Sequence, residues 1–359
     1  MKTIEIGLLG KHGLAMLVGV AMLVILVGTG GNIWFGRTAG QIARDQFNAE
    51  QLVVARNVRY WVERQMAALG KELELLAKKA ENGASDPRTL QPLLQPAFER
   101  VVGLGVDRIE LVDPRRREKY TYYPFRLNPE RSPLSPDDEA PEVAGLSSAA
   151  GSSRIRIIET LPAGSDIQLT LSMELTNLSP ARLAFQVNLS WFLAPFLKHI
   201  RSGKDGYAWL LDDQGRFLFH PYTAFTGRSA FDARHQRDPG ISLQRIDTIQ
   251  KEGMLKGLEG TGAYLSAWHL GITGPMEKLI AYTPITISES PLRKWSVAVV
   301  APMHEIGPAL ARIHRLQLFL QAMVLLVVFS AAAVVYFFRL RWHQRLEECE
   351  AIRSQALKL

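Results

Sequence analysis

Three tyrosines and an arginine lie close together in the first half of the chain, at Tyr120, Tyr122, Tyr123 and Arg126. A guanidinium offers a forked pair of donors for a carboxylate or a phosphate, and tyrosines supply apolar walls with polar tips. Alternation along a strand would put Tyr120 and Tyr122 on one face and Tyr123 on the other. This cluster is the best candidate ligand site in the sequence. The competing interpretation is that the tyrosines pack beneath the following loop and Arg126 stays in water.

A second group of ring-bearing residues could line a pocket in the second half of the chain: Tyr207, Trp209, His220, Tyr264 and Trp268. Tyr207 and Trp209 share a strand face by alternation. The competing interpretation is ordinary packing of aromatic residues on a sheet, with His220 as a hairpin residue before Pro221.

Other reactive patterns give no sign of a metal, a cofactor or catalysis. Asp113, Asp212 and Asp213 are predicted turn formers, because their spacing lacks the oxygen-rich calcium loop. The histidines include no H-x-x-x-H and no H-E-x-x-H. No G-x-S-x-G, Walker loop or Rossmann fingerprint occurs in a suitable context. We therefore expect no metal site, no cofactor and no enzymatic activity in this chain.

The charge of the chain does not point to nucleic acid. The 359 residues carry a formal net charge of +7, but the positive side chains are dispersed. The one basic triplet, at 115–117, follows Asp113-Pro114 and is typical of a solvated turn. A mean hydropathy of zero is high for a soluble enzyme, and it arises from two long apolar runs.

Residues 13–36 and 316–338 contain no charged side chain. As helices they would be roughly 34–36 Å long, enough to cross a hydrocarbon core of about 30 Å. Aromatic residues close both runs, as they do at a membrane interface. We predict a transmembrane helix at 13–36 and another within the helical segment 306–338. The competing interpretation of the first run is a cleaved signal peptide, because Lys2 and Lys11 precede it.

Two spans would place both ends of the chain on the same side of the membrane. Arg339, Arg341 and Arg345 follow the second run and favour a cytoplasmic location for the ends. We predict a bacterial inner membrane protein with residues 1–12 and 339–359 in the cytoplasm. The large domain would lie in the periplasm or outside the cell, and the lipid bilayer would be a partner.

The predicted cytoplasmic segment 339–359 holds the only cysteine, Cys349, so no disulfide braces the large domain. Leu346, Cys349, Ile352 and Ala356 share a helix face. This helix would either begin a parallel coiled coil between two copies or lie on the lipid surface. The segment contains no recognisable kinase core, cyclase domain or methyl-accepting hairpin. We therefore expect the output on a missing or separate cytoplasmic domain.

Periodicity places the elements that would position these residues. Apolar residues recur at steps of three or four from residue 38 to about 79 and predict one long helix. A long loop is predicted at 127–153, and a short helix capped by Ser190 at 190–200. Alternating segments predict strands at 108–112, 119–123, 154–161, 167–175, 183–189, 207–211, 216–221, 262–268, 278–284 and 295–300.

Two of the predicted hairpins follow the same pattern. Each runs from an apolar strand through an aspartate-led turn into an aromatic strand that ends at a proline, Pro124 or Pro221. The repeat suggests two tandem modules, at 37–189 and 190–305. The predicted fold class is α+β: a long N-terminal helix carrying two antiparallel-sheet modules, flanked by two transmembrane helices.

Four segments carry a family resemblance: IARDQFNAEQLVVARNVRYWVE, LAFQVNLSWFLAPFLKHIRSGKDG, GYAWLLDDQGRFLFHP and LIAYTPITISESPLRKWSVAVVAPMHEI. Together they resemble the double-Cache sensor domain of bacterial transmembrane receptors, a tandem of PAS-like modules between two transmembrane helices. The likeness covers about 35–305 and is greatest to the sensor portion of membrane-bound histidine kinases.

The resemblance implies a small extracellular ligand in the membrane-distal module and a signal passed on as a small helix displacement. Many members that sense amino acids or amines carry a Trp-Tyr pair after the second strand of that module. Here the corresponding stretch, YTYYPFRLNPE, contains Arg126 but no such pair. An amino-acid ligand is therefore not carried over.

These observations favour a ligand-sensing receptor subunit that forms a homodimer and acts on a cytoplasmic kinase or on other membrane subunits. The alternative is a structural or assembly subunit of a larger membrane complex that uses a Cache-like domain for docking. A membrane-anchored enzyme is the third interpretation.

Overall fold

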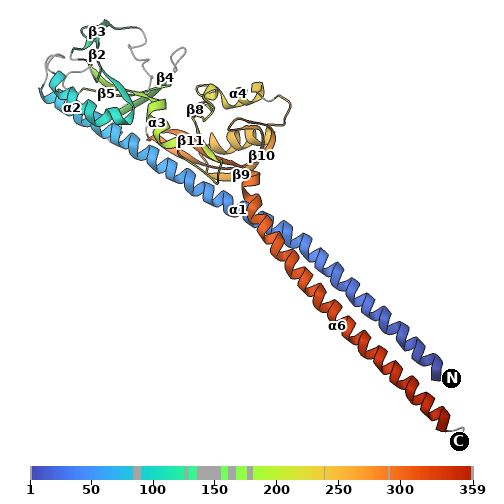
Figure 1. Cartoon of the computed structure of the whole chain (residues 1–359). Helices are drawn as coiled ribbons and strands as arrows, with labels where there is room; N and C mark the ends of the chain where they lie inside the picture. Colours follow the sequence, from blue (N-terminus) through green and yellow to red (C-terminus); the bar gives the residue numbers. More distant parts are fainter. Residues whose placement is uncertain are drawn as a thin grey trace. The chain divides into compact units, whose positions relative to one another are not determined.

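A computed structural model describes residues 2–83, 90–124, 126, 128–135, 155–160, 167–175, 181–237, 239–289 and 292–356 (Figure 1). The chain divides into two compact units. Gln46–Glu305 forms the large unit, which holds both sheets. Met1–Asp45 and Ile306–Leu359 form the other.

The predicted α+β class is confirmed by the order of helices and strands. In the first half these are α1 (Lys2–Gly83), α2 (Gln91–Val101), η2 (Val102–Leu104), β1 (Val106–Asp113), β2 (Glu118–Tyr122), β3 (Glu130–Pro133), β4 (Ile155–Thr160), β5 (Gln168–Glu174), β6 (Arg182–Asn188) and α3 (Leu189–Leu197). The second half contains β7 (Tyr207–Leu211), β8 (Phe217–Phe219), η3 (Thr223–Phe225), α4 (Ala230–Arg237), α5 (Gln244–Thr248), η4 (Ile249–Met254), β9 (Gly260–His269), β10 (Ile272–Glu289), β11 (Leu292–Pro302), η5 (Met303–Ile306) and α6 (Gly307–Ala356).

Residues of helix α1 pack against both sheets. The helix predicted at 38–79 falls within it, and Val58, Val62, Leu69 and Leu73 are fully buried on its apolar face. These side chains belong to one continuous core that also includes residues of both sheets. Burial of a repeating apolar face is what holds such a helix in place, since a long helix gains little from intrinsic propensity alone.

The first sheet has the strand order β3-β2-β1-β6-β5-β4, and neighbouring strands are antiparallel. Phe185 on β6 lies opposite Ile109 on β1 and Leu171 on β5, and all three are buried in the core that includes α1. Residues alternate between the two faces of a strand, so the other face of this sheet receives the polar side chains.

The long loop predicted at 127–153 is wrong in part, because β3 lies within it and pairs with β2. Its sequence ERSP ends in proline, which is tolerated in an edge strand but gives no strand signal. Residues 136–153 lie outside the described residues. The other strands predicted for this sheet each match an observed strand to within two residues.

The second sheet has the strand order β8-β7-β11-β10-β9 and separates two cores. Leu210 on β7 and Val297 on β11 face the core that includes α1. Trp209 and Ala298, their neighbours in sequence, face a second core, which also contains residues of α4 and α5. Alternation along the strands thus creates an inner face toward α1 and an outer face covered by short helices. The strand predicted at 278–284 is the middle of the much longer β10.

Helix α3 begins with a different cap from the one predicted. The N-cap is Asn188, whose Oδ1 accepts a hydrogen bond from the N–H of Trp191 at 3.0 Å. The prediction of Ser190 is wrong because the helix starts at Leu189, which puts Ser190 inside the first turn.

Asn188→Ala is expected to lower the free energy of unfolding by about 1 kcal/mol, because it removes the acceptor for a helix-terminal N–H. Ser190→Ala should cost less, since Ser190 does not occupy the cap position. Urea unfolding of both variants tests this, and an equal cost for the two would contradict the assignment of the cap.

One helix among the described residues is long and apolar enough to cross a membrane. It is Ala311–Arg353 within α6. Its most apolar stretch has a mean hydropathy of 2.6, and none of that stretch is buried. This helix contains the second predicted span, 316–338. The first predicted span, 13–36, lies in α1, but residues 13–18 and several others have side chains outside the described ones. That span stays a prediction.

Candidate functional site

The first predicted cluster is divided between the core and the surface. Tyr120 and Tyr122, on β2, are buried in the core that includes α1, so they share a face as expected. The guanidinium of Arg126 lies 5.2 Å from the ring centre of the half-buried Tyr123 and pairs with Glu130 at 3.5 Å. The four side chains therefore do not form one pocket in the described structure. The predicted ligand role of Tyr120, Tyr122, Tyr123 and Arg126 stays a prediction.

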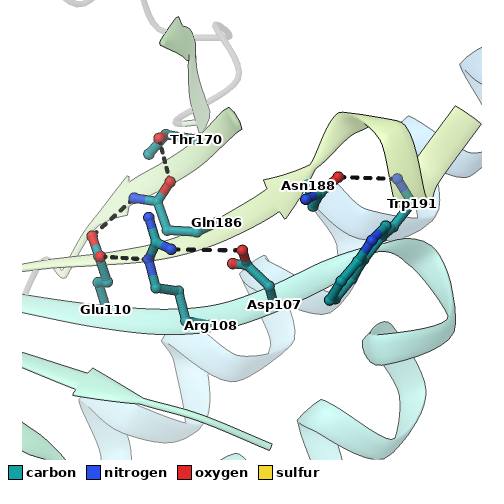
Figure 2. Close-up of polar contacts among 7 residues, drawn as sticks. All are labelled: Asp107, Arg108, Glu110, Thr170, Gln186, Asn188 and Trp191. Carbon is teal, nitrogen blue, oxygen red and sulfur yellow. Dashed lines mark hydrogen bonds and ion pairs between the residues drawn. The ribbon is translucent and has the colours of Figure 1, made fainter. Parts of the chain in front are cut away.

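The outer face of the first sheet carries a chain of polar contacts that the sequence did not predict (Figure 2). Thr170 donates a hydrogen bond to Gln186 at 2.6 Å, and the Gln186 amide donates to Glu110 at 2.8 Å. Arg108 contacts Glu110 at 3.1 Å and Asp107 at 3.6 Å. Burial raises the pKa of Asp107, and the charge of Arg108 partly offsets that rise. A ligand here would compete with hydrogen bonds already made within the protein.

The second predicted group converges on one cavity at the outer face of the second sheet. Its lining consists of Tyr207, Trp209, His220, Phe225, Arg234, Leu243, Tyr264, Leu265, Ser266, Ala267, Trp268 and Lys278. The cavity has a volume of about 20 Å³, which is room for a single water molecule. A larger ligand therefore requires lining side chains to move.

Ring contacts connect the strands around this cavity. Tyr207 on β7 lies 5.6 Å from His220 and 6.1 Å from Trp268 on β9, measured between ring centres. His220, which directly follows β8, lies 5.7 Å from Trp268. Its Nδ1 accepts the N–H of Tyr222 at 3.0 Å, so the imidazole is fixed in the wall. His220, for which a hairpin residue was the competing interpretation, thus lines the cavity as the candidate site predicts.

Two buried cationic side chains enter the cavity. Lys278 on β10 donates hydrogen bonds to Oη of Tyr207 at 3.1 Å and to the backbone oxygen of Trp268. Arg234 on α4 donates to Oε1 of Gln250 at 2.7 Å. The exposed fractions are 1% for Lys278 and 9% for Arg234. Lysine and arginine side chains are seldom buried this deeply, so two of them in one small cavity mark it as a functional candidate.

Burial and these charges set the protonation of the lining. The pKa of His220 lies well below its usual value, because burial and the charges of Arg234 and Lys278 disfavour the imidazolium. Burial raises the pKa of Tyr207 well above its usual value and that of Tyr264 to about 12. At neutral pH the cavity therefore presents a neutral imidazole, two neutral phenols and positive charge.

A π-helical turn, η4, holds the partner of Arg234 in place. Gln250, in this turn, is fully buried and accepts the arginine hydrogen bond. Gly253 in the same turn lies against the phenol of Tyr282, where any Cβ would overlap the hydroxyl. Single π-helical turns occur frequently at functional sites. Here the turn brings an amide to a buried guanidinium.

A separate polar group lies where β11 leads into α6. Candidate metal-ligand atoms of Asp205, His304 and Glu305 lie within 4.8 Å of one another. The Glu305 carboxylate accepts the backbone N–H groups of Lys204 at 3.1 Å and Asp205 at 2.8 Å. These bonds give it a structural role as a turn cap. The expectation that the chain holds no metal stays a prediction.

Comparison with known proteins identifies the fold. No family model and no curated protein matches the sequence. The periplasmic sensory domain of the Campylobacter jejuni chemoreceptor Tlp1 aligns with a TM-score of 0.51 at 11% identity, covering 72% of this chain and 95% of that domain. The extracellular domain of mmHK1S-Z3, described as a histidine kinase, aligns with a TM-score of 0.50 at 12% identity, covering 76% of this chain and 98% of that domain. The chain carries a double-Cache fold.

The double-Cache fold confirms the predicted resemblance, and the cavity described above lies in its second module. Arg234 and Lys278 are cavity residues that the sequence pattern did not predict. Lys278 is the first residue of the strand predicted at 278–284, and a charged residue is common at a strand end. In the structure it lies within β10, opposite Tyr264 on β9. The one sequence feature that could have indicated a buried lysine is its position directly before the apolar residues of that strand. Arg234 lies on α4, in a stretch whose polar residues indicate no element.

Proposed function

We propose that this chain is a membrane-anchored receptor subunit that senses a small molecule in the cavity of the second module. The observation that carries the proposal is the convergence of the five predicted aromatic and histidine residues with two buried cations. Small-molecule sites are concave, mostly apolar or aromatic, and contain a few convergent polar groups. The names of the structural neighbours, a chemoreceptor sensory domain and a histidine kinase extracellular domain, support a sensing role.

A short path along the chain leads from this cavity to α6. Tyr207 lies opposite Val300 on β11, and Lys278 on β10 lies opposite Pro302, the last residue of β11. Only η5 separates Pro302 from α6. A ligand that displaces Tyr207 or Lys278 would therefore shift the end of β11. In this proposal binding changes the populations of two arrangements of that strand end, and α6 transmits the difference.

The proposal extends to the membrane and the partners. The receptor would be a homodimer in the bacterial inner membrane, with spans at 13–36 and 316–338 and both termini in the cytoplasm. The output would belong to a cytoplasmic kinase or to other membrane subunits. The apolar helix Ala311–Arg353 supports the second span.

Binding to the full chain in lipid nanodiscs tests the sensing role. A library of small metabolites is screened by thermal shift and by tryptophan fluorescence, since Trp209 and Trp268 line the cavity. We expect saturable binding that Ser266→Trp, which fills the cavity, abolishes. The matched control is Thr261→Trp, which places the same ring at an exposed position of β9 and should bind as the unaltered chain does.

Two outcomes would contradict this assignment. Binding that survives Ser266→Trp but is lost in Glu110→Gln would move the ligand to the outer face of the first sheet, within the module where the resemblance implies a ligand. The absence of saturable binding by any compound, together with stable co-purification of other membrane subunits, would favour the assembly role.

A further inference from the structure

One end of the membrane unit, which comprises Met1–Asp45 and Ile306–Leu359, concentrates positive charge. This end consists of residues 37–45 of α1 and 307–315 of α6. Its arginines and its one acid are Arg37, Arg44, Arg312, Arg315 and Asp45. In the proposed orientation this end faces away from the cytoplasm, where basic residues beside a span are usually few. The arginines oppose that orientation, so a ligand at this surface would account for them.

Two of these arginines lie at the same level of the membrane unit. Helices α1 and α6 meet at Gly36, where an added Cβ would lie 3.1 Å from Nε2 of His314. Arg37 and Arg315 are the next residues in sequence. Arg37 directly follows the first charge-free run, and Arg315 directly precedes the second. In the proposed membrane arrangement this boundary is the depth of the lipid phosphates.

A cavity of about 420 Å³ lies between the two helices at this boundary. Its lining consists of Ile33, Gly36, Arg37, His314, Gln317 and Leu318. Ile33 and Leu318 are exposed, and each lies one helical turn deeper in its charge-free run than Arg37 or His314. The lining therefore changes from cationic and polar at the boundary to largely apolar below it. A phospholipid changes in the same order, from its phosphate to its acyl chains.

The positive charge at this cavity is not neutralised within the described part of the chain. Arg315 lies three residues before Leu318 and shares its helix face, so it flanks the lining. Its Nε donates to the backbone oxygen of Ala311 at 3.4 Å, and neither Arg37 nor Arg315 forms an ion pair with a described residue. Asp45 is eight residues from Arg37, about 12 Å along the helix. Both guanidinium groups can therefore bind an anion.

We propose that this cavity binds the headgroup of an anionic phospholipid. The inference rests on the proposed function only in its membrane anchoring. A lipid phosphate matches the forked donors of a guanidinium. Two unneutralised arginines favour a headgroup with a net negative charge over phosphatidylcholine, whose ammonium cancels the charge of its phosphate. Ile33 and Leu318 would contact the first carbons of the acyl chains. A phosphate held by Arg37 and Arg315 would connect α1 to α6.

Native mass spectrometry of the full chain in detergent measures such binding directly. The chain is titrated with phosphatidylglycerol and with phosphatidylcholine of the same acyl chains, and the phosphatidylglycerol complex is then challenged with inorganic phosphate. We expect one phosphatidylglycerol per chain to bind at least about fivefold more tightly than phosphatidylcholine. Inorganic phosphate should not displace it, because the free anion lacks the acyl chains that contact the apolar part of the lining.

Arginine variants locate the bound lipid. Arg37→Gln and Arg315→Gln should each weaken phosphatidylglycerol binding about fivefold. The matched control is Arg312→Gln, which removes the same charge from the same end of α6. Arg312 lies outside the lining, and it is six residues from Leu318, about 120° away around the helix. This variant should bind phosphatidylglycerol as the unaltered chain does.

The outcomes separate this inference from the proposed function. Equal binding of the two lipids, or an equal loss in Arg312→Gln and Arg37→Gln, would mean a general surface attraction and overturns the lipid site. Displacement by inorganic phosphate would make the cavity a site for free anions and overturns it as well. All three results leave the sensing function intact. A chain that stays monodisperse without detergent would instead contradict the membrane anchoring itself. Should a variant fail to fold, the comparison of the two lipids on the unaltered chain decides.

Discussion

Phe185→Ala is expected to lower the free energy of unfolding by about 3–5 kcal/mol, the cost typical of removing a fully buried aromatic ring. Phe185 has no exposed surface and lies on β6, between Ile109 on β1 and Leu171 on β5. Its ring also belongs to the core that contains the buried face of α1. The smaller side chain would leave a cavity that strands held on both sides cannot close. The loss includes both the transfer free energy and the missing contacts.

Chemical denaturation of the full chain, followed by tryptophan fluorescence, measures this loss. The matched control is Val53→Ala on α1, where the valine is 53% exposed. Its cost should stay within about 0.5 kcal/mol, as for most surface substitutions. A similar cost for the two variants would mean that Phe185 does not join the first sheet to the helix.

The parts of the fold that the sequence predicted are those with a strong period. The long helix repeats its apolar residues at steps of three or four, and it buries that face along most of 55–80. The strands of the first sheet alternate because one face meets the helix core and the other carries polar groups. The helical period and the strand alternation both arise because each element is buried on one side only, so apolar residues recur at the buried positions.

Elements without such a one-sided pattern were missed. Helix α2 contains Pro96, and α4 has a strongly polar sequence with only Ala230, Ala233 and Arg234 buried. The turn η4 is π-helical, so its side chains do not follow the ordinary helix period. Strand β10 was predicted too short because it continues beyond its apolar middle, through a bulge between Thr273 and Met276. In each case tertiary contacts decide the structure, and local residue types do not report them.

Strand alternation also explains why the second predicted group of residues lines one cavity and the first group does not. Alternation grouped Tyr207 with Trp209 correctly, and the sheet then brought β7 and β9 residues to one outer face. Alternation also grouped Tyr120 with Tyr122, but which face meets α1 depends on how the sheet packs. Residue types alone do not tell whether a face that carries tyrosines packs against a helix or lines a ligand site. The polar contacts of the first sheet in Figure 2 were missed because Gln186 and Glu110 lie far apart in sequence.

Acidification is expected to destabilise the chain through His220. An unfolded histidine titrates near pH 6.5, whereas burial and the charges of Arg234 and Lys278 hold the pKa of His220 well below that value in the folded state. Between the two pKa values the unfolded chain binds a proton that the folded chain does not. The stability that His220 contributes is complete above about pH 6.5 and falls with the pH by up to about 1.4 kcal/mol per unit. His269, with a folded pKa of about 4, acts in the same direction.

Denaturation of the full chain between pH 7 and pH 5 tests whether acidification lowers the free energy of unfolding and whether His220 is the cause. His220→Gln removes the titrating group and keeps an acceptor near the N–H of Tyr222, so its stability should fall less steeply with acidification. The control is His199→Gln, which removes an exposed imidazole and should keep the slope of the unaltered chain.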